Sequence, residues 1–130
     1  MRQSIPVGVC TSPEAVPALA SGYDHVELSA AGVLAGADAT DGAVDLAALR
    51  ALCPPVRAFN CFVPGDIRLV GPDVSPEQVA AYAATTIARA AGADAELIVF
   101  GSGGSRRVPE GFARSKAWDQ LVWFLRMCAD

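Results

Sequence analysis

Four short apolar runs, each followed by a helix-like pattern, set the strongest limit on what this chain can fold into. The clearest run is Leu97-Ile98-Val99-Phe100, which no polar residue interrupts. Such a run is typical of a strand in a parallel sheet that helices cover on both faces. Neighbouring parallel strands need a crossover connection, which is usually a helix. The alternation therefore predicts the α/β class, with four βα units and a parallel sheet.

The other predicted elements have local signals of their own. Residues 5–10, 23–28 and 56–63 read as the remaining strands. Ser75 and Gln78 have capping-box spacing, and the proline between them suits the first position of a helix. Periodicity does not fix strand order, so two arrangements remain open, half of a β/α barrel and a small flavodoxin-like sheet.

A last helix is predicted over residues 115–130. Its expected buried stripe consists of four apolar residues, Trp118, Leu121, Val122 and Leu125. Trp123 is also expected to serve packing. The chain ends within this helix without the Gly or Asn that commonly follows a helix end. We expect residues 1–130 to be one domain, and the count of four βα units fits half of an eight-unit β/α barrel.

The composition argues against two classes of partner. Ten Lys and Arg against fourteen Asp and Glu give a formal charge of -4, with no basic stripe for nucleic acid. The apolar run over residues 5–10 is too short for a signal peptide or a membrane span. We therefore expect no nucleic-acid partner, no membrane partner and a cytoplasmic location.

The four cysteines show no C-x-x-C spacing, which disfavours a zinc knuckle or a thioredoxin-type motif. Cys10, Cys61 and His25 are the remaining candidates for a metal site, but their spacing is not that of a typical zinc site. Reduced thiols that fill space as small apolar residues are the expected alternative. We expect His25 to be structural.

Ligand sites in parallel α/β folds gather at the carboxyl ends of the strands. This rule selects Cys10, Glu27, Asn60 and the loop that begins at Gly101. Glu27 is the strongest chemical candidate, because a carboxylate on a strand can act as a general base or bind sugar hydroxyls. The alternative is a structural charge paired with an arginine.

The loop Gly101-Ser102-Gly103-Gly104-Ser105-Arg106-Arg107 is the second candidate site. Backbone N–H groups of Gly101, Ser102 and Gly103 can form an anion-binding nest, and Arg106 and Arg107 can add bidentate donors to a phosphate. The loop lacks both the P-loop Gly-Lys-Ser/Thr and the G-x-G-x-x-G pattern. A flexible turn with solvated arginines is the alternative.

Four stretches together carry a family resemblance: Gly22-Tyr23-Asp24-His25-Val26-Glu27-Leu28, Asn60-Cys61-Phe62-Val63-Pro64-Gly65-Asp66, Leu69-Val70-Gly71-Pro72-Asp73 and Val99-Phe100-Gly101-Ser102-Gly103-Gly104-Ser105-Arg106-Arg107-Val108-Pro109-Glu110-Gly111-Phe112. They resemble the first half of sugar phosphate isomerase/epimerase proteins, whose fold is the xylose isomerase-like TIM barrel. The resemblance covers nearly the whole chain. It implies βα units 1 to 4 of a (β/α)8 barrel.

The resemblance also implies a reaction. Proteins of this family isomerise or epimerise sugars or polyols by abstracting a proton next to a carbonyl, with a divalent metal holding substrate oxygens. Their metal ligands, a Glu, Asp, His and Glu set, come from the second half of the barrel. We therefore expect this chain alone to bind no metal ion. Glu27, Asn60 and the glycine-rich loop correspond to the rim of the family's pocket.

Activity is therefore expected only in a completed barrel. A second copy of the chain or a separate second half could cover the open sheet edges. Two other readings stay open, a non-catalytic module that binds an anionic ligand or supports assembly, and an inactive fragment.

Overall fold

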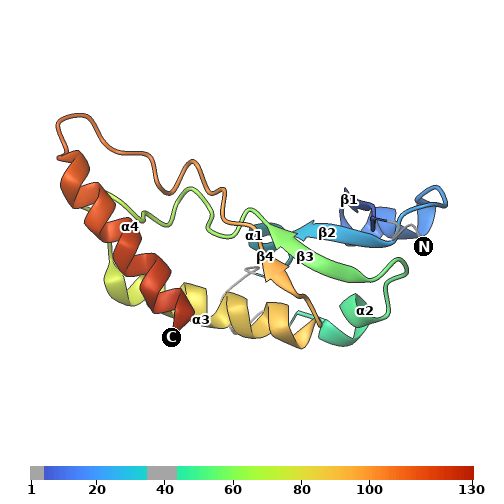
Figure 1. Ribbon diagram of the computed structural model, residues 1–130. Helices are drawn as coiled ribbons and strands as arrows, with labels where there is room; N and C mark the ends of the chain where they lie inside the picture. Colours follow the sequence, from blue (N-terminus) through green and yellow to red (C-terminus); the bar gives the residue numbers. More distant parts are fainter. Residues whose placement is uncertain (1–4, 35–43) are drawn as a thin grey trace.

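The computed structural model describes residues 5–34 and 44–130. Within them lies a four-stranded sheet in the order β1-β2-β3-β4, in which every neighbouring pair is parallel (Figure 1). The strands are β1 (Gly8–Cys10), β2 (His25–Ser29), β3 (Val56–Asn60) and β4 (Leu97–Ile98). The α/β prediction is confirmed, and each strand pairs with its neighbour in the sequence.

Helices connect and follow the strands. They are the 3₁₀ helix η1 (Pro13–Ala18) and the α-helices α1 (Ala30–Val33), α2 (Leu46–Arg50), α3 (Pro76–Gly92) and α4 (Arg114–Ala129). The predicted cap of α3 forms, since Ser75 Oγ accepts a hydrogen bond from the N–H of Gln78 at 3.4 Å. The short helix α1 directly follows β2, and residues 35–43 lie outside the described chain.

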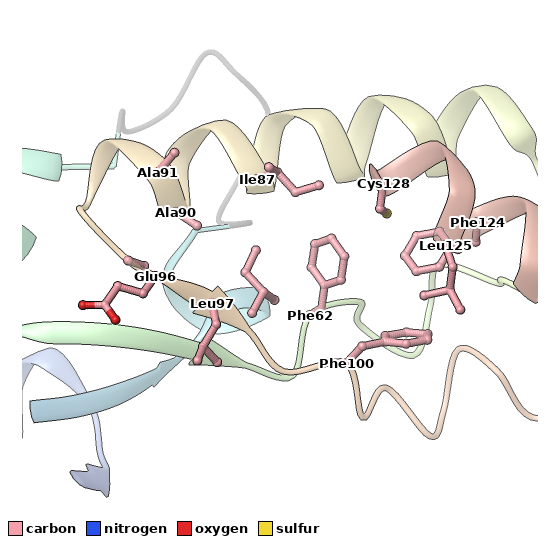
Figure 2. Close-up of a pocket in the computed structure, with 12 residues that line it drawn as sticks. Phe62, Ile87, Ala90, Ala91, Glu96, Leu97, Phe100, Phe124, Leu125 and Cys128 are labelled. Carbon is pink, nitrogen blue, oxygen red and sulfur yellow. The ribbon is translucent and has the colours of Figure 1, made fainter. Parts of the chain in front are cut away.

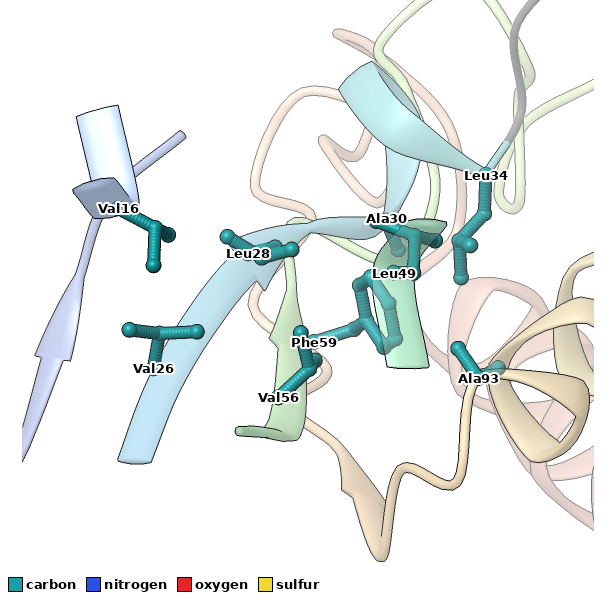
Figure 3. Close-up of a cluster of buried hydrophobic side chains, with 10 residues drawn as sticks. Val16, Val26, Leu28, Ala30, Leu34, Leu49, Val56, Phe59 and Ala93 are labelled. Atoms are coloured by element: carbon teal, nitrogen blue, oxygen red, sulfur yellow. The ribbon is translucent and has the colours of Figure 1, made fainter. Parts of the chain in front are cut away.

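One face of the sheet packs against helices and forms the first core. Side chains from the two central strands meet residues of η1, α1, α2 and the end of α3 (Figure 3), the buried set being Val16, Val26, Leu28, Ala30, Leu34, Leu49, Val56, Phe59, Ala90 and Ala93. Figure 1 places α2 and α3 on the same side of the sheet. Val26 and Leu28 alternate with His25 and Glu27 along β2, and both face this core.

The opposite face carries a row of residues that no described helix covers. Cys10 pairs with Glu27, Glu27 with Ala58, and Ala58 with Leu97, so these four residues cross the sheet side by side. We call this side the open face. The apolar run of the fourth strand was expected to be buried on both faces, and this was wrong: Leu97 is 53% exposed and Val99 43% exposed.

A second core joins α3 and α4 to the segments that follow β3 and β4. Its centre is aromatic: the ring centroid of Phe124 lies 5.8 Å from that of Phe62 and 5.2 Å from that of Phe100. The face of α4 that packs here contains Ala117, Leu121, Phe124 and Cys128, a helical i, i+4, i+7, i+11 series.

The buried stripe predicted for the last helix was displaced by one residue. Trp118 and Leu125 are 67% and 52% exposed, so the packing expected of Trp118 is wrong, whereas Trp123 is 39% exposed and partly covered. A shift of one position rotates a helix face by about 100°. Ala117 and Phe124 are the buried residues of α4, and Phe124 fixes the rotation of the helix because its ring fills the aromatic cluster. Among the helices described, none has both the length and the apolar character needed to cross a bilayer.

We expect Phe124→Ala to lower the free energy of unfolding by about 3–5 kcal/mol, because it leaves a cavity among packed rings. Trp118→Ala, on the same helix, should change it by less than about 1 kcal/mol, since the side chain is 67% exposed. Urea unfolding followed by circular dichroism measures both. Equal losses in the two variants would contradict this packing of α4.

Candidate functional site

The carboxyl ends of the first two strands bring a thiol beside a carboxylate. Cys10 is the last residue of β1 and lies directly opposite Glu27 of β2 in the parallel register. The N–H of Thr11 then donates to the carbonyl of Glu27 at 3.0 Å, which holds the two strand ends together. Both side chains belong to the open face, where neighbouring residues on adjacent strands can touch.

A bulge in β3 determines which side of the sheet Asn60 occupies. Consecutive residues of β2 pair with Val56 and Ala58, so Arg57 is an extra residue with no partner in that register. The extra residue reverses the alternation, and Val56 and Phe59 therefore both reach the buried core. Asn60 is then left on the open face, together with Ala58.

Asn60 links the carboxylate and the thiol. Its Nδ2 donates to Glu27 Oε1 at 2.8 Å and lies 3.6 Å from Cys10 Sγ. The structure thus brings together the predicted residues Glu27 and Asn60. The partner of Glu27 is an amide rather than the arginine of the structural alternative. The one ion pair found among the described residues joins Arg57 to Glu96.

The thiol of Cys10 is held in its protonated form. Desolvation, the charge of Glu27 and a hydrogen bond to Glu27 raise the pKa of Cys10, whereas the hydrogen bond from Asn60 lowers it. The negative charge of Cys61 adds to the rise. Cys10 is therefore a protonated thiol rather than a ready nucleophile near neutral pH.

His25 packs against the strand beside it. A Cβ atom on Gly8 would lie 2.1 Å from His25 Nε2, so the imidazole covers the space that any larger residue at this position would need. This contact supports the structural role expected for His25.

The glycine-rich loop after β4 is fastened to the loop after β3. Ser102, which has a φ of 43°, accepts at Oγ from the N–H of Val63 at 2.9 Å. A Cβ on Gly104 would lie 3.2 Å from the Cα of Gly65, so the two loops approach at a pair of glycines. The N–H of Leu69 donates to the carbonyl of Ser105 at 2.9 Å. The loop is therefore not the free turn of the flexible alternative.

Two guanidinium groups bind the carbonyls of this loop. Arg106 Nε donates to the carbonyl of Gly101, and Arg68 donates to the carbonyls of Gly104 and Arg107. Arg106 and Arg107 are exposed. In the predicted anion nest, a phosphate would compete with the carbonyl of Gly101 for the Arg106 guanidinium, because part of that group already stabilises the fold of its own loop. No described contact joins Arg106 or Arg107 to Glu27.

No pattern in the sequence indicated that Arg68 binds the carbonyls of the glycine-rich loop. Arg68 lies in the loop between β3 and α3, and only the fold brings it to carbonyls 36 and 39 positions later in the chain. Cys10 was a strand-end candidate, and its register opposite Glu27 could not be read from the sequence.

A separate apolar cleft lies beside β4. Its volume is about 370 Å³, and Leu97, Phe100, Ile87, Leu125 and Cys128 are among the residues that line it (Figure 2). These residues come from β4 and the segment after it, from α3 and from α4. Since β4 pairs only with β3 among the described strands, the cleft adjoins an unpaired strand edge.

A metal site does not fit the side chains described here. In residues 5–34 and 44–130, no three or more His, Cys, Asp or Glu side chains lie together in a way that could hold a metal ion. This includes the set of Cys10, Cys61 and His25 considered from the sequence.

Comparisons with protein-family models, with curated proteins and with solved structures each gave no match. The chemistry of the site follows from its own geometry. A carboxylate with one amide partner, on a face that no described helix covers, can accept a proton from a small polar molecule or hydrogen-bond to its hydroxyl groups.

The anion-nest prediction is tested by removing its two cations. Arg106→Ala/Arg107→Ala should weaken the binding of inorganic phosphate about tenfold or more, because charge-assisted hydrogen bonds contribute about 1.5–3 kcal/mol each. Isothermal titration calorimetry at low salt measures this. Arg114→Ala/Arg126→Ala on α4 removes the same charge elsewhere and should leave the affinity nearly unchanged. Equal effects of the two double variants, or no binding by the unaltered protein, would contradict the nest.

Proposed function

We propose that this chain is half of a sugar phosphate isomerase/epimerase-type TIM barrel, whose reaction is the interconversion of sugars or polyols. The observation that carries the proposal is the Glu27 carboxylate, held by Asn60 at the carboxyl ends of parallel strands on the open face. In barrels this is the end of the sheet at which substrates bind. The resemblance supplies the substrate class.

Glu27 is the base in this proposal. Its Oε1 accepts a hydrogen bond from Asn60 Nδ2, which fixes the orientation of the carboxylate. The carboxylate takes the proton from a carbon next to a carbonyl and returns it to the neighbouring carbon or to the opposite face. The hydroxyl groups of the sugar are bound by the rim, for which Asn60 and the loop from Gly101 are the proposed residues.

The divalent metal that the resemblance implies has no ligand cluster among the described residues. We therefore assign no step to it. The steps given to Glu27 and Asn60 require only their own side chains.

Several features support completion of the barrel. The strands follow one another in sequence order, all are parallel, and helices cover one face of the sheet. This is the arrangement of consecutive barrel strands, whose other face points toward the barrel interior. Leu97 and Val99 on the open face, together with the apolar cleft beside β4, are surfaces that a further strand would bury (Figure 2).

A second copy of the chain offers the complementary edge. β1 is the other edge strand of the sheet, and the residues leading into it are apolar and exposed, Ile5 at 85% and Val7 at 52%. A two-fold axis would place β1 of each copy beside β4 of the other and keep all strands parallel. We therefore propose a homodimer with one shared barrel interior.

The dimer is tested by molar mass. Sedimentation equilibrium of the unaltered protein should give twice the chain mass of 13.4 kDa. Leu97→Lys should shift the protein to monomers, because it places a charge on the surface that the partner copy would bury. Trp118→Lys on the exposed side of α4 should not. A monodisperse monomer of the unaltered protein with unchanged circular dichroism would contradict the homodimer.

The reaction is tested by hydrogen exchange at carbon. Incubation with a panel of aldose and ketose phosphates in D2O, with Mg²⁺ or Mn²⁺ present, should incorporate deuterium next to the carbonyl, as seen by NMR. Glu27→Gln should slow the incorporation about 10²–10⁴-fold, since it removes the base. Glu96→Gln removes an exposed carboxylate that pairs with Arg57 and should have little effect. Incorporation that survives in Glu27→Gln would contradict the proposal.

A further inference from the structure

Cys10 belongs to the same group of atoms as the proposed base. It lies opposite Glu27 in the register, and Nδ2 of Asn60 lies within reach of both side chains, at 2.8 Å from Glu27 Oε1 and 3.6 Å from Cys10 Sγ. Asn60 Nδ2 has two hydrogens, so one amide can serve a carboxylate and a thiolate.

We infer that Cys10 and Glu27 form a coupled proton-donor and proton-acceptor pair, with Asn60 as the bridge that stabilises the negative charge on either member. The inference rests on the proposed function only for the use of this pair in catalysis. The pairing itself depends on the geometry of the three side chains.

The pair carries one negative charge, and the charge can move between its members. While Glu27 is ionised, its charge and hydrogen bond keep the proton on Cys10 and hold the pKa of the thiol above its usual value. When Glu27 takes up a proton, that repulsion disappears and Cys10 becomes the stronger acid. The thiol therefore becomes ready to give its proton at the stage when a substrate oxygen needs one.

The proposed reaction transfers one proton to Glu27 and one proton from Cys10. The C–H bond next to the carbonyl breaks, and its proton goes to Glu27. Its electron pair forms the C=C bond of an enediol, while the carbonyl π electrons move to oxygen, which takes the proton of Cys10 Sγ. The pair then holds a carboxylic acid and a thiolate. Reversal of the two transfers on the other carbon completes isomerisation and restores both residues.

Other titratable groups near this thiol are few. Cys61, which follows β3, is the second thiol that acts on Cys10, and His25 lies one pleat earlier on β2. Cys61 has the same sign of charge as Glu27 when ionised. A measurement of the pair must therefore follow each cysteine separately.

The coupling can be measured without any substrate. The rate of alkylation of each cysteine by iodoacetamide, followed by peptide mass spectrometry between pH 6.5 and 10, reports how readily its thiol ionises. In Glu27→Gln the midpoint for Cys10 should move to lower pH, and alkylation at pH 7.5 should become about three- to tenfold faster, since the negative charge that helps to raise the pKa of Cys10 is removed.

Two further variants test the direction of the shift and provide a control. In Asn60→Ala the Cys10 midpoint should move to higher pH, opposite to Glu27→Gln, because the bridging donor is lost. Loosened structure would speed alkylation in both variants. Glu96→Gln removes the same charge outside the group and should leave Cys10 unchanged. Exposed Cys53 serves as the internal reference in every sample.

An unchanged Cys10 profile in Glu27→Gln, or shifts of the same direction in Glu27→Gln and Asn60→Ala, would overturn the pair whatever the protein catalyses. With the opposite shifts observed, absence of deuterium incorporation by the unaltered protein would reject the proposed function and leave the pair supported. If incorporation occurs, Cys10→Ala should slow it at least about tenfold. Full activity of Cys10→Ala would overturn Cys10 as the acid.

Discussion

Burial on a single face of the sheet is the constraint on which the rest of this structure depends. Val26, Leu28 and Phe59 are fully buried against helices, whereas residues of the opposite face meet no described helix. In a parallel sheet covered on both sides, Glu27 would lose its hydration, and a buried carboxylate without a charged partner is strongly unfavourable. One-sided packing therefore allows a carboxylate, an amide and a thiol to gather where apolar side chains would otherwise be required.

Because of the same constraint, dimer formation would also affect the catalytic carboxylate in the proposed function. Leu97 and Glu27 belong to one row across the sheet, so a partner that covers Leu97 also reduces the access of water to the carboxylate. Lower local polarity strengthens the hydrogen bond from Asn60 and the coupling between Glu27 and Cys10. A closed barrel would thus bury the exposed apolar edge and strengthen the proton pair in one step.

Much of the fold could be predicted from local patterns, because caps and strand alternation depend on residues close in sequence. Ser75 caps α3 as expected, and each of the four predicted strand ranges overlaps a strand of the sheet. The rotation of α4 could not be predicted in this way. It depends on which residue fills the aromatic cluster, and Phe124 competes for that position with residues of similar hydrophobicity on neighbouring faces of the helix.

The rule that ligand sites lie at the carboxyl ends of strands selected Glu27 and Asn60 for the candidate site. Strict alternation in β3, however, would have placed the two side chains on opposite faces of the sheet. Counting by twos from buried Val56 assigns Asn60 to the helix-covered face. The bulge at Arg57 reverses that assignment, since it adds one residue between two core positions. A bulge is a property of the pairing between two strands, and neither strand encodes it alone. The contact between Asn60 and Glu27 therefore depends on tertiary structure, as does the position of Arg68 at the glycine-rich loop.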